Sequence, residues 1–215
     1  VPTVISDYPD LIFKNIYTYF NFTLNNEDAN KTEMYKQQFE RENSKAAFIS
    51  IDDYLASLEI EIRIVKNDKS HVPRIAQLTQ KTNQFNLTTK RYTDQDIEKF
   101  MDIGKVFAFS VCDRFGDLGI VGVVIVLDAA IDTFLLSCRA FGRGIENTML
   151  SSVLDSIKQY PVTATYIKTK KNIMVHNFYS NNGFSTKLES ESLITYEAWE
   201  FPQIKTSQLK EVSWI

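Results

Sequence analysis

A glycine-containing turn between a strand-like run and a helix constrains the fold of this chain most. The turn lies in residues 138–146 (CRAFGRGIE), directly after the apolar run at residues 134–136. Apolar residues then recur at three-to-four spacing, which predicts an amphipathic helix after the turn. Gly142 and Gly144 have no side chain where the backbone bends, so their N–H groups can face an anion at the positive end of the helix dipole. The pattern predicts a phosphate or pyrophosphate site, and a plain strand-to-helix turn is the alternative.

A second motif follows a strand-like run at residues 163–168. Residues 172–184 predict a short helix that ends at Gly183, a C-cap. Together the two motifs resemble the GNAT family of N-acyltransferases in their order and spacing. The resemblance implies an α/β (α+β) fold, in which helices flank a mixed, mostly antiparallel sheet. It rests on Arg139, Gly142, Gly144, Asn172, Phe178, Tyr179, Gly183 and Phe184.

The resemblance also implies how the fold binds its cofactor, acyl-CoA or another phosphopantetheine thioester. In that family the glycine loop holds the pyrophosphate, and the residue that matches Asn172 lies beside the pantetheine arm. Arg143, inside the loop, presents a fork of donors that suits phosphate. Arg139, at the end of the strand, either bonds phosphate or braces the carbonyl groups of the loop. The predicted cofactor-binding residues are Arg139, Phe141, Gly142, Arg143, Gly144, Ile145 and Asn172.

Three residues are candidates for acyl-transfer chemistry. Tyr179 is the expected acid, because its phenol has an ordinary pKa of about 10 and can donate a proton to a leaving thiolate; a core tyrosine is the alternative. Cys138, where the strand ends, is a candidate nucleophile, although buried cysteines usually act as small hydrophobic residues. His176 precedes Tyr179 by one helical turn, so it is either a proton relay or a surface or packing histidine.

The activation of the thioester carbonyl and the catalytic base are less well defined. In the resembled fold a backbone N–H of the strand before the loop polarises the carbonyl, which here places it near residues 136–138. GNAT enzymes often use a glutamate on that strand as the base, and no glutamate lies there in this chain. The missing glutamate favours a domain that binds a thioester without transferring the acyl group.

Amides gather in one loop at Asn83, Gln84 and Asn86, after a predicted helix that starts at Pro73. Amides in a loop can bond either a ligand or the backbone. In GNAT folds this region shapes the side on which the acceptor binds, so the three residues are candidate substrate contacts. The alternative is that they cap the end of the helix.

Charge near the glycine loop favours one thioester donor over another. The predicted helix at residues 145–156 contains no Lys or Arg, and Glu146 at its start would repel an extra phosphate. CoA carries more phosphate groups than the arm of a carrier protein. Three lysines lie at the end of the next predicted strand or just after it, at Lys168, Lys170 and Lys171. They either supply positive charge from the opposite side of the phosphate site or form a solvated turn. We therefore expect a carrier-bound arm to be preferred over free CoA.

Two further runs narrow the resemblance. Residues 73–89 and 113–119 look like the C-terminal half of FkbH-like proteins, and the likeness extends from about Tyr8 to Phe201. Those proteins join an upstream HAD-type phosphatase domain to a GNAT-like domain, and they are associated with loading a glyceryl unit onto an acyl carrier protein in polyketide-type biosynthesis. The phosphatase motif Asp-x-Asp-x-Thr is absent from this chain. The expected parts are a helical linker (1–50), a GNAT-like domain (51–203) and a surface tail (204–215).

Periodicity predicts the individual elements of these parts. Polar and apolar spacing indicates helices, and alternating or continuous apolar runs indicate strands. Helices are expected at residues 7–20, 26–46, 51–57, 73–82, 93–101, 145–156 and 172–182, and strands at residues 58–64, 105–112, 119–127, 132–138, 163–168 and 197–201.

Composition excludes several classes of protein. The net charge of −3 argues against nucleic acid as the main partner. The longest apolar run, residues 119–127, is shorter than the about 20 residues that span a membrane. Two His and two Cys at scattered positions predict neither a metal site nor a disulfide framework, and we expect a cytoplasmic protein. Two functions remain, an acyltransferase and a non-catalytic carrier-protein-binding module that serves the upstream phosphatase-like domain.

Overall fold

The computed structural model describes residues 26–206 and 209–215, with side chains from residue 36 onward. Contacts within the chain divide it into two units, residues 1–42 and 43–215. The predicted polar helix is confirmed as α2 (Asn26–Lys45). The helix expected at residues 7–20 lies outside the described residues. The boundaries expected at residues 50 and 203 stay predictions.

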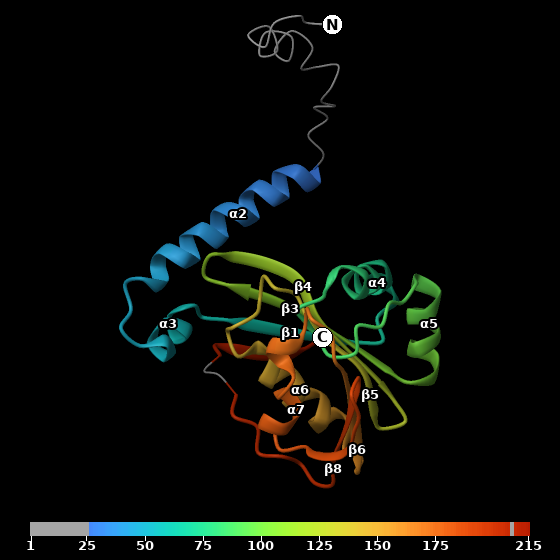
Figure 1. The fold of residues 1–215 in the computed structure, drawn as a ribbon. Helices are drawn as coiled ribbons and strands as arrows, with labels where there is room; N and C mark the ends of the chain where they lie inside the picture. Colours follow the sequence, from blue (N-terminus) through green and yellow to red (C-terminus); the bar gives the residue numbers. More distant parts are fainter. Residues whose placement is uncertain (1–25, 207–208) are drawn as a thin grey trace, which may run out of the picture. The chain divides into compact units, whose positions relative to one another are not determined.

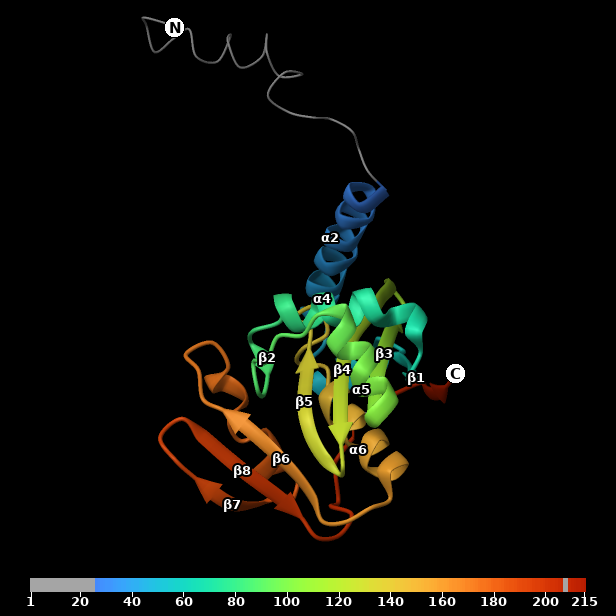
Figure 2. The same cartoon turned by 90° about the vertical axis from the view of Figure 1, so that its right-hand side faces the viewer.

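A mixed sheet forms the centre of the second unit (Figures 1 and 2). The strand order is β7-β8-β6-β5-β4-β3-β1-β9, and β2 pairs with β5 off this path. Among the described strands, β1 with β9 and β5 with β6 pair in parallel, and the other neighbours are antiparallel. The predicted mixed, mostly antiparallel sheet is therefore confirmed. The strands are β1 (Glu61–Lys66), β2 (Phe85–Asn86), β3 (Lys105–Asp113), β4 (Gly116–Leu127), β5 (Ala130–Leu136), β6 (Val162–Ile167), β7 (Ser185–Glu189), β8 (Leu193–Ala198) and β9 (Glu211–Trp214).

Helices cover both faces of this sheet. Successive strand residues point to opposite sides, so apolar side chains on both faces can pack against helices. Val123 belongs to the apolar cluster under α4 and α5, whereas its neighbour Val124 belongs to the cluster under α6 and α7. The helix expected at residues 93–101 is α5, which opens with a capping box formed by Thr93 and Asp96. No helix in the described part of the chain is long and apolar enough to cross a membrane. The remaining helices and 3-10 turns are α3 (Ile51–Ser57), η1 (Lys69–His71), α4 (Val72–Lys81), α5 (Asp94–Ile103), α6 (Ile145–Ile157), η2 (Ile173–Val175) and α7 (Phe178–Asn181).

The C-terminal third departs most from the predicted elements. The single helix expected at residues 172–182 is wrong, because the chain forms η2, leaves the helical path near Asn177, and starts again as α7. The strand expected at residues 197–201 lies earlier, in β8, where alternate residues reach the core. β7 was not predicted, because all five of its residues are exposed and show no apolar alternation. The segment expected as a surface tail contains β9, which pairs with β1 and places Trp214 against Phe107.

Candidate functional site

The glycine loop lies between β5 and α6, as the sequence predicts. Gly142 (φ 80°) and Gly144 (φ 72°) both adopt the left-handed conformation, which disfavours residues with a Cβ. Gly144 is the N-cap of α6 and offers no side-chain hydrogen bond to the first turn. A Cβ on Gly142 would meet no atom within 4 Å, so the loop is open at this point. The N-terminus of this 13-residue helix therefore has the geometry of an anion site.

Arg143 points into the protein rather than out of the loop. Its side chain is 8% exposed, and one guanidinium nitrogen lies 3.3 Å from Oδ2 of Asp113, whose side chain is 0% exposed. Another guanidinium nitrogen donates to the carbonyl of Arg139 at 2.8 Å. The structure thus gives Arg143 the bracing role that the sequence left open for Arg139. A contact of Arg143 with phosphate would require this buried pair to open.

Cys138 and Arg139 lie where the chain leaves β5. The thiol of Cys138 is exposed. Arg139 is partly buried, and this burial lowers the pKa of its guanidinium. The pKa of Arg74, on α4, is lowered first by burial and then by the charge of Arg139, and Arg74 donates to the carbonyl of Ile120 at 3.0 Å. Arg74 and Arg139 are both partly buried.

The gap beside β5 is filled by the chain itself. β5 and β6 pair in parallel over only two residue pairs at their start. Residues 85–87, which we call the wedge, enter the space beyond: β2 pairs with the end of β5, the N–H of Leu87 donates to Phe134 at 3.0 Å, and the N–H of Ile167 donates to Leu87 at 2.8 Å. The wedge therefore occupies the edge of β5 at residues 134–136, and it reaches Leu136, the first of the residues (136–138) where the thioester carbonyl was expected.

Asn172 fastens the wedge instead of facing a ligand. It is 0% exposed, and its Nδ2 donates to the carbonyl of Asn86 at 2.8 Å and to that of Ile167 at 3.0 Å. Its Oδ1 accepts from the hydroxyl of Tyr166 at 3.1 Å and from the hydroxyl of Thr169 at 2.8 Å. Because both ends of this amide are bonded inside the protein, a cofactor could reach Asn172 only if the wedge moved.

The three amides predicted as substrate contacts do not converge on one surface. Asn86 is 0% exposed and donates to the carbonyl of Thr82, the C-cap of α4, at 3.2 Å. Asn83 accepts from Arg91 at 2.5 Å. Of the three, only Gln84 is exposed. The capping alternative therefore describes Asn86, and the amides shape the loop that carries the wedge.

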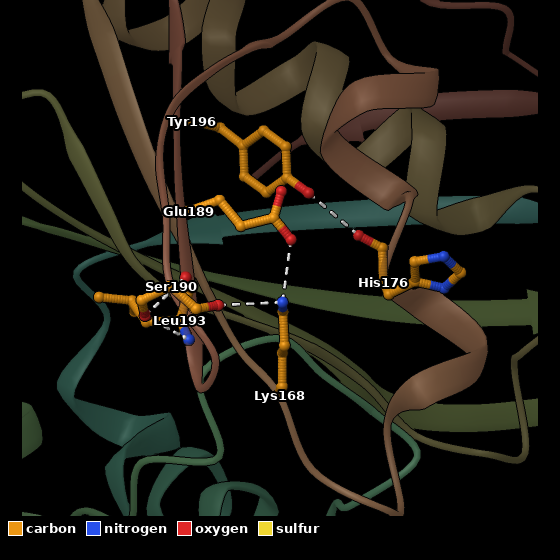
Figure 3. A network of polar contacts seen from close by, with 6 residues as sticks. All are labelled: Lys168, His176, Glu189, Ser190, Leu193 and Tyr196. Atoms are coloured by element: carbon orange, nitrogen blue, oxygen red, sulfur yellow. Dashed lines mark hydrogen bonds and ion pairs between the residues drawn. The ribbon is translucent and has the colours of Figure 1, made fainter.

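Tyr179 and His176 do not form the expected pair on one helical face. Tyr179 is 1% exposed, and its hydroxyl has no hydrogen-bond partner among the described residues. Burial raises the pKa of Tyr179 well above its ordinary value. His176 is exposed between η2 and α7; its backbone carbonyl accepts from Tyr196 at 3.2 Å, and its imidazole points away from that bond (Figure 3). Tyr179 thus takes the position of a core tyrosine, the alternative left open by the sequence.

Replacing Tyr179 by phenylalanine is expected to raise the free energy of unfolding by about 1 kcal/mol. A buried hydroxyl without a partner costs about 1–3 kcal/mol, and the substitution removes only that atom. Urea unfolding measures the change. The matched control is Tyr166→Phe, which removes a hydroxyl that bonds to Asn172 and should lower stability. A loss of stability in Tyr179→Phe as large as in Tyr166→Phe would contradict this placement.

A pocket of about 350 Å³ opens beside the start of α6. Glu146, in the first turn, lines this pocket, and burial raises the pKa of its carboxyl. Its Oε2 atom is buried and has no hydrogen-bond partner among the described residues. The ring of Phe85 lines the same pocket and lies 5.2 Å from that of Phe178, so the wedge forms part of the wall. Other lining residues include Phe141, Met174, Asn177, Asn181 and Lys205.

Sequence reasoning missed the two features that define this pocket, the wedge and the buried acid. The signal for the wedge was the alternation of Phe85, Asn86 and Leu87, which is a short strand pattern surrounded by amides. Glu146 was read only as a charge near the loop, because burial depends on residues distant in sequence. In residues 26–206 and 209–215, no cluster of three or more His, Cys, Asp or Glu side chains could hold a metal ion.

The sequence matches no protein-family model, and no curated protein is significantly similar to it. Several solved acetyltransferases share structural similarity with the chain. An IAA acetyltransferase from Bacillus cereus is 13% identical, with a TM-score of 0.46 over 65% of this chain and 99% of that chain. A GNAT-family acetyltransferase from Listeria monocytogenes is 12% identical (TM-score 0.45; 62% and 91% covered), and a spermidine N-acetyltransferase from Vibrio cholerae is 12% identical (0.46; 66% and 94%). Similarity at this level identifies neither a substrate nor a site residue in this chain.

Proposed function

We propose that this domain binds a phosphopantetheine thioester, with the phosphate at the glycine loop and the arm in the adjacent pocket. The observation that carries the proposal is the left-handed turn at Gly142 and Gly144, which leaves open space at Gly142 just before α6 and beside the pocket. Backbone N–H groups at a helix N-terminus bind phosphate without requiring a side-chain charge. Arg139, at the start of the loop, adds a guanidinium on the same segment.

An acyl carrier protein is the partner that suits this site better than free CoA. Glu146 lies in the first turn of α6, and its carboxylate would repel any phosphate beyond the one at the loop. Lys168, one of three lysines considered for the far wall, is paired with Glu189 at 2.9 Å (Figure 3). Its ammonium group is therefore engaged by a carboxylate, whereas the neighbouring Lys170 and Lys171 are exposed. CoA becomes a competing, weaker ligand.

Binding without transfer is the function that the geometry favours, because the wedge fills the gap between β5 and β6 and the hydroxyl of Tyr179 is buried. Acyl transfer is the second candidate, and the exposed thiol of Cys138 favours it. A surface thiolate at the loop could exchange with a thioester, taking the acyl group and releasing the thiol of the arm. Mass spectrometry after incubation with an acylated carrier protein separates the two, since only transfer leaves an acyl group on Cys138.

The wider context proposed for the domain is that of FkbH-like proteins. There it would serve an upstream HAD-type phosphatase domain in loading a glyceryl or similar acyl unit onto the carrier, in the cytoplasm and in polyketide-type biosynthesis. Residues 73–89 and 113–119 support this proposal, since they carry the likeness. In the fold the first run supplies the wedge, and the second supplies Asp113, which pairs with Arg143 beneath the glycine loop.

Replacing Gly142 by aspartate is expected to weaken binding of 4′-phosphopantetheine by about tenfold relative to replacement by asparagine. Both residues tolerate the left-handed conformation better than other side chains, and both would enter open space. Only aspartate brings a negative charge to the proposed phosphate site. Isothermal titration calorimetry measures the two affinities, with pantetheine, which lacks the phosphate, as the control ligand. Equal affinities of the two variants for 4′-phosphopantetheine would contradict a phosphate at this loop.

A further inference from the structure

The pocket beside the glycine loop ends at the wedge. Phe85 is 2% exposed, and its ring packs edge to face on Phe141 at 5.5 Å and on Phe178 at 5.2 Å between centroids. Behind this ring, Leu87 is hydrogen-bonded to both β5 and β6. A ligand that enters the pocket beside α6 therefore meets an aromatic wall, and the gap between the two strands is closed to it.

Side chains on both sides of the wedge hold it in place. Asn172, which is distant in sequence, donates to the carbonyl of Asn86 in the middle of the wedge. After it, the hydroxyl of Tyr92 donates to Oδ2 of Asp132 on β5 at 2.6 Å, and Lys90 pairs with the same carboxylate. The wedge is thus a fastened part of the sheet, and the pocket in front of it is blind.

Glu146 brings an unused acceptor into this pocket. Its Oε2 atom is buried without a hydrogen-bond partner among the described residues, and the residue lines the pocket. Two amides of the pocket lining bond elsewhere, since Asn147 donates to the carbonyl of Lys205 at 2.8 Å and accepts from Asn182 at 3.2 Å. A buried acceptor of this kind destabilises the folded protein unless a ligand supplies an N–H or O–H group.

The size and lining of the pocket restrict that ligand further. Its volume of about 350 Å³ is near the lower end of ligand pockets, which span about 300–1,000 Å³, so it suits a slender chain rather than a nucleotide. Phe141 and Met174 offer apolar surface for methylene groups, and Asn177, Asn181 and Lys205 offer polar groups at other points of the lining. An alkyl chain that carries amide and hydroxyl groups fits this combination.

We infer that the pocket binds the uncharged part of the phosphopantetheine arm on the α6 face of the sheet, with Glu146 accepting a hydrogen bond from an amide or hydroxyl group of the arm. The inference rests on the proposed function and adds the path that the thioester arm would follow. Because Phe85 closes the gap between β5 and β6, the thioester end stays on this face and does not pass between the strands. Glu146 is then the residue that selects the arm.

The test titrates pantetheine and 4′-phosphopantetheine into the full chain by calorimetry. Glu146→Ala is expected to weaken both ligands by about tenfold, because the acceptor is lost. Glu146→Gln keeps the volume and one acceptor oxygen, so it should bind both ligands better than Glu146→Ala does. Asp155→Asn, an exposed acid in the last turn of the same helix, is the matched control and should leave both affinities unchanged. Thermal melts confirm that each variant is folded. If Glu146→Ala is not folded, the affinities of Glu146→Gln are compared with those of the unmodified chain instead.

The outcomes separate this inference from the proposed function. Unchanged affinities in both Glu146 variants overturn the inference, and a loss in Gly142→Asp relative to Gly142→Asn would then still support the phosphate site. A second outcome has two parts: Glu146→Ala loses pantetheine binding, and the unmodified chain binds 4′-phosphopantetheine no more tightly than pantetheine. This outcome supports the inference and contradicts the phosphate site. If the unmodified chain binds neither ligand, both proposals are overturned.

Discussion

Replacing Arg143 by methionine is expected to lower the free energy of unfolding by about 3–5 kcal/mol. The guanidinium faces Asp113, whose side chain is 0% exposed, and it also donates to the carbonyl of Arg139. Methionine fills much of the space of arginine but supplies no charge, so a buried carboxylate would lose the cation that faces it. Chemical denaturation of the variant and of the unmodified chain measures the difference.

Two comparisons make the Arg143 result specific. The double variant Asp113→Asn, Arg143→Met is expected to recover part of the loss, because the buried charge is removed together with its partner. Arg114→Met is the matched control: this arginine is exposed and stacks over the ring of Phe115 at 4.7 Å, so its loss should cost less than about 1 kcal/mol. If Arg143→Met proved as mild as Arg114→Met, the side chain of Arg143 would lie at the loop surface, where its position in the motif predicts a contact with phosphate.

Elements with strong local signals were predictable from the sequence. The glycine turn, the helix after it and the capping box of Thr93 and Asp96 each depend on residues within a few positions of one another. The hairpin of β3 and β4 is similar, since two apolar runs are joined by a short charged turn. The mixed sheet flanked by helices followed from the family resemblance of the two motifs.

Contacts between distant residues could not be predicted in this way. Asp113 lies thirty positions before Arg143, and Asn86 lies eighty-six positions before Asn172. Each predicted site residue was assigned from its type and its place in a motif, which does not reveal whether another segment occupies the same space. The amide of Asn172 suits a pantetheine arm or the carbonyl of Asn86 equally well, because both present the same kind of hydrogen-bonding group. The structure decides between them by placing the wedge there.

Replacing Phe85 by alanine is expected to lower the free energy of unfolding by about 3–5 kcal/mol. The ring is 2% exposed and packs against the rings of Phe134, Phe141 and Phe178, so its removal leaves a cavity beside them. Phe85→Leu retains most of the apolar volume and should cost less than half as much, which makes it the matched control. Denaturant unfolding measures both variants, and hydrogen exchange of the Leu87 and Ile167 amides reports whether the wedge stays paired.

The Phe85 result also distinguishes the two candidate functions. In the unmodified chain, the amides of Leu87 and Ile167 should exchange as slowly as those of the central strands, because both are bonded within the sheet. A loss below about 1 kcal/mol in Phe85→Ala, together with fast exchange at these two amides, would show that the wedge leaves the gap readily. The edge of β5 would then be accessible to a thioester carbonyl, and acyl transfer would replace binding as the favoured function. A large loss with slow exchange in the unmodified chain keeps the gap closed, so a thioester arm would have to bind in the blind pocket beside α6.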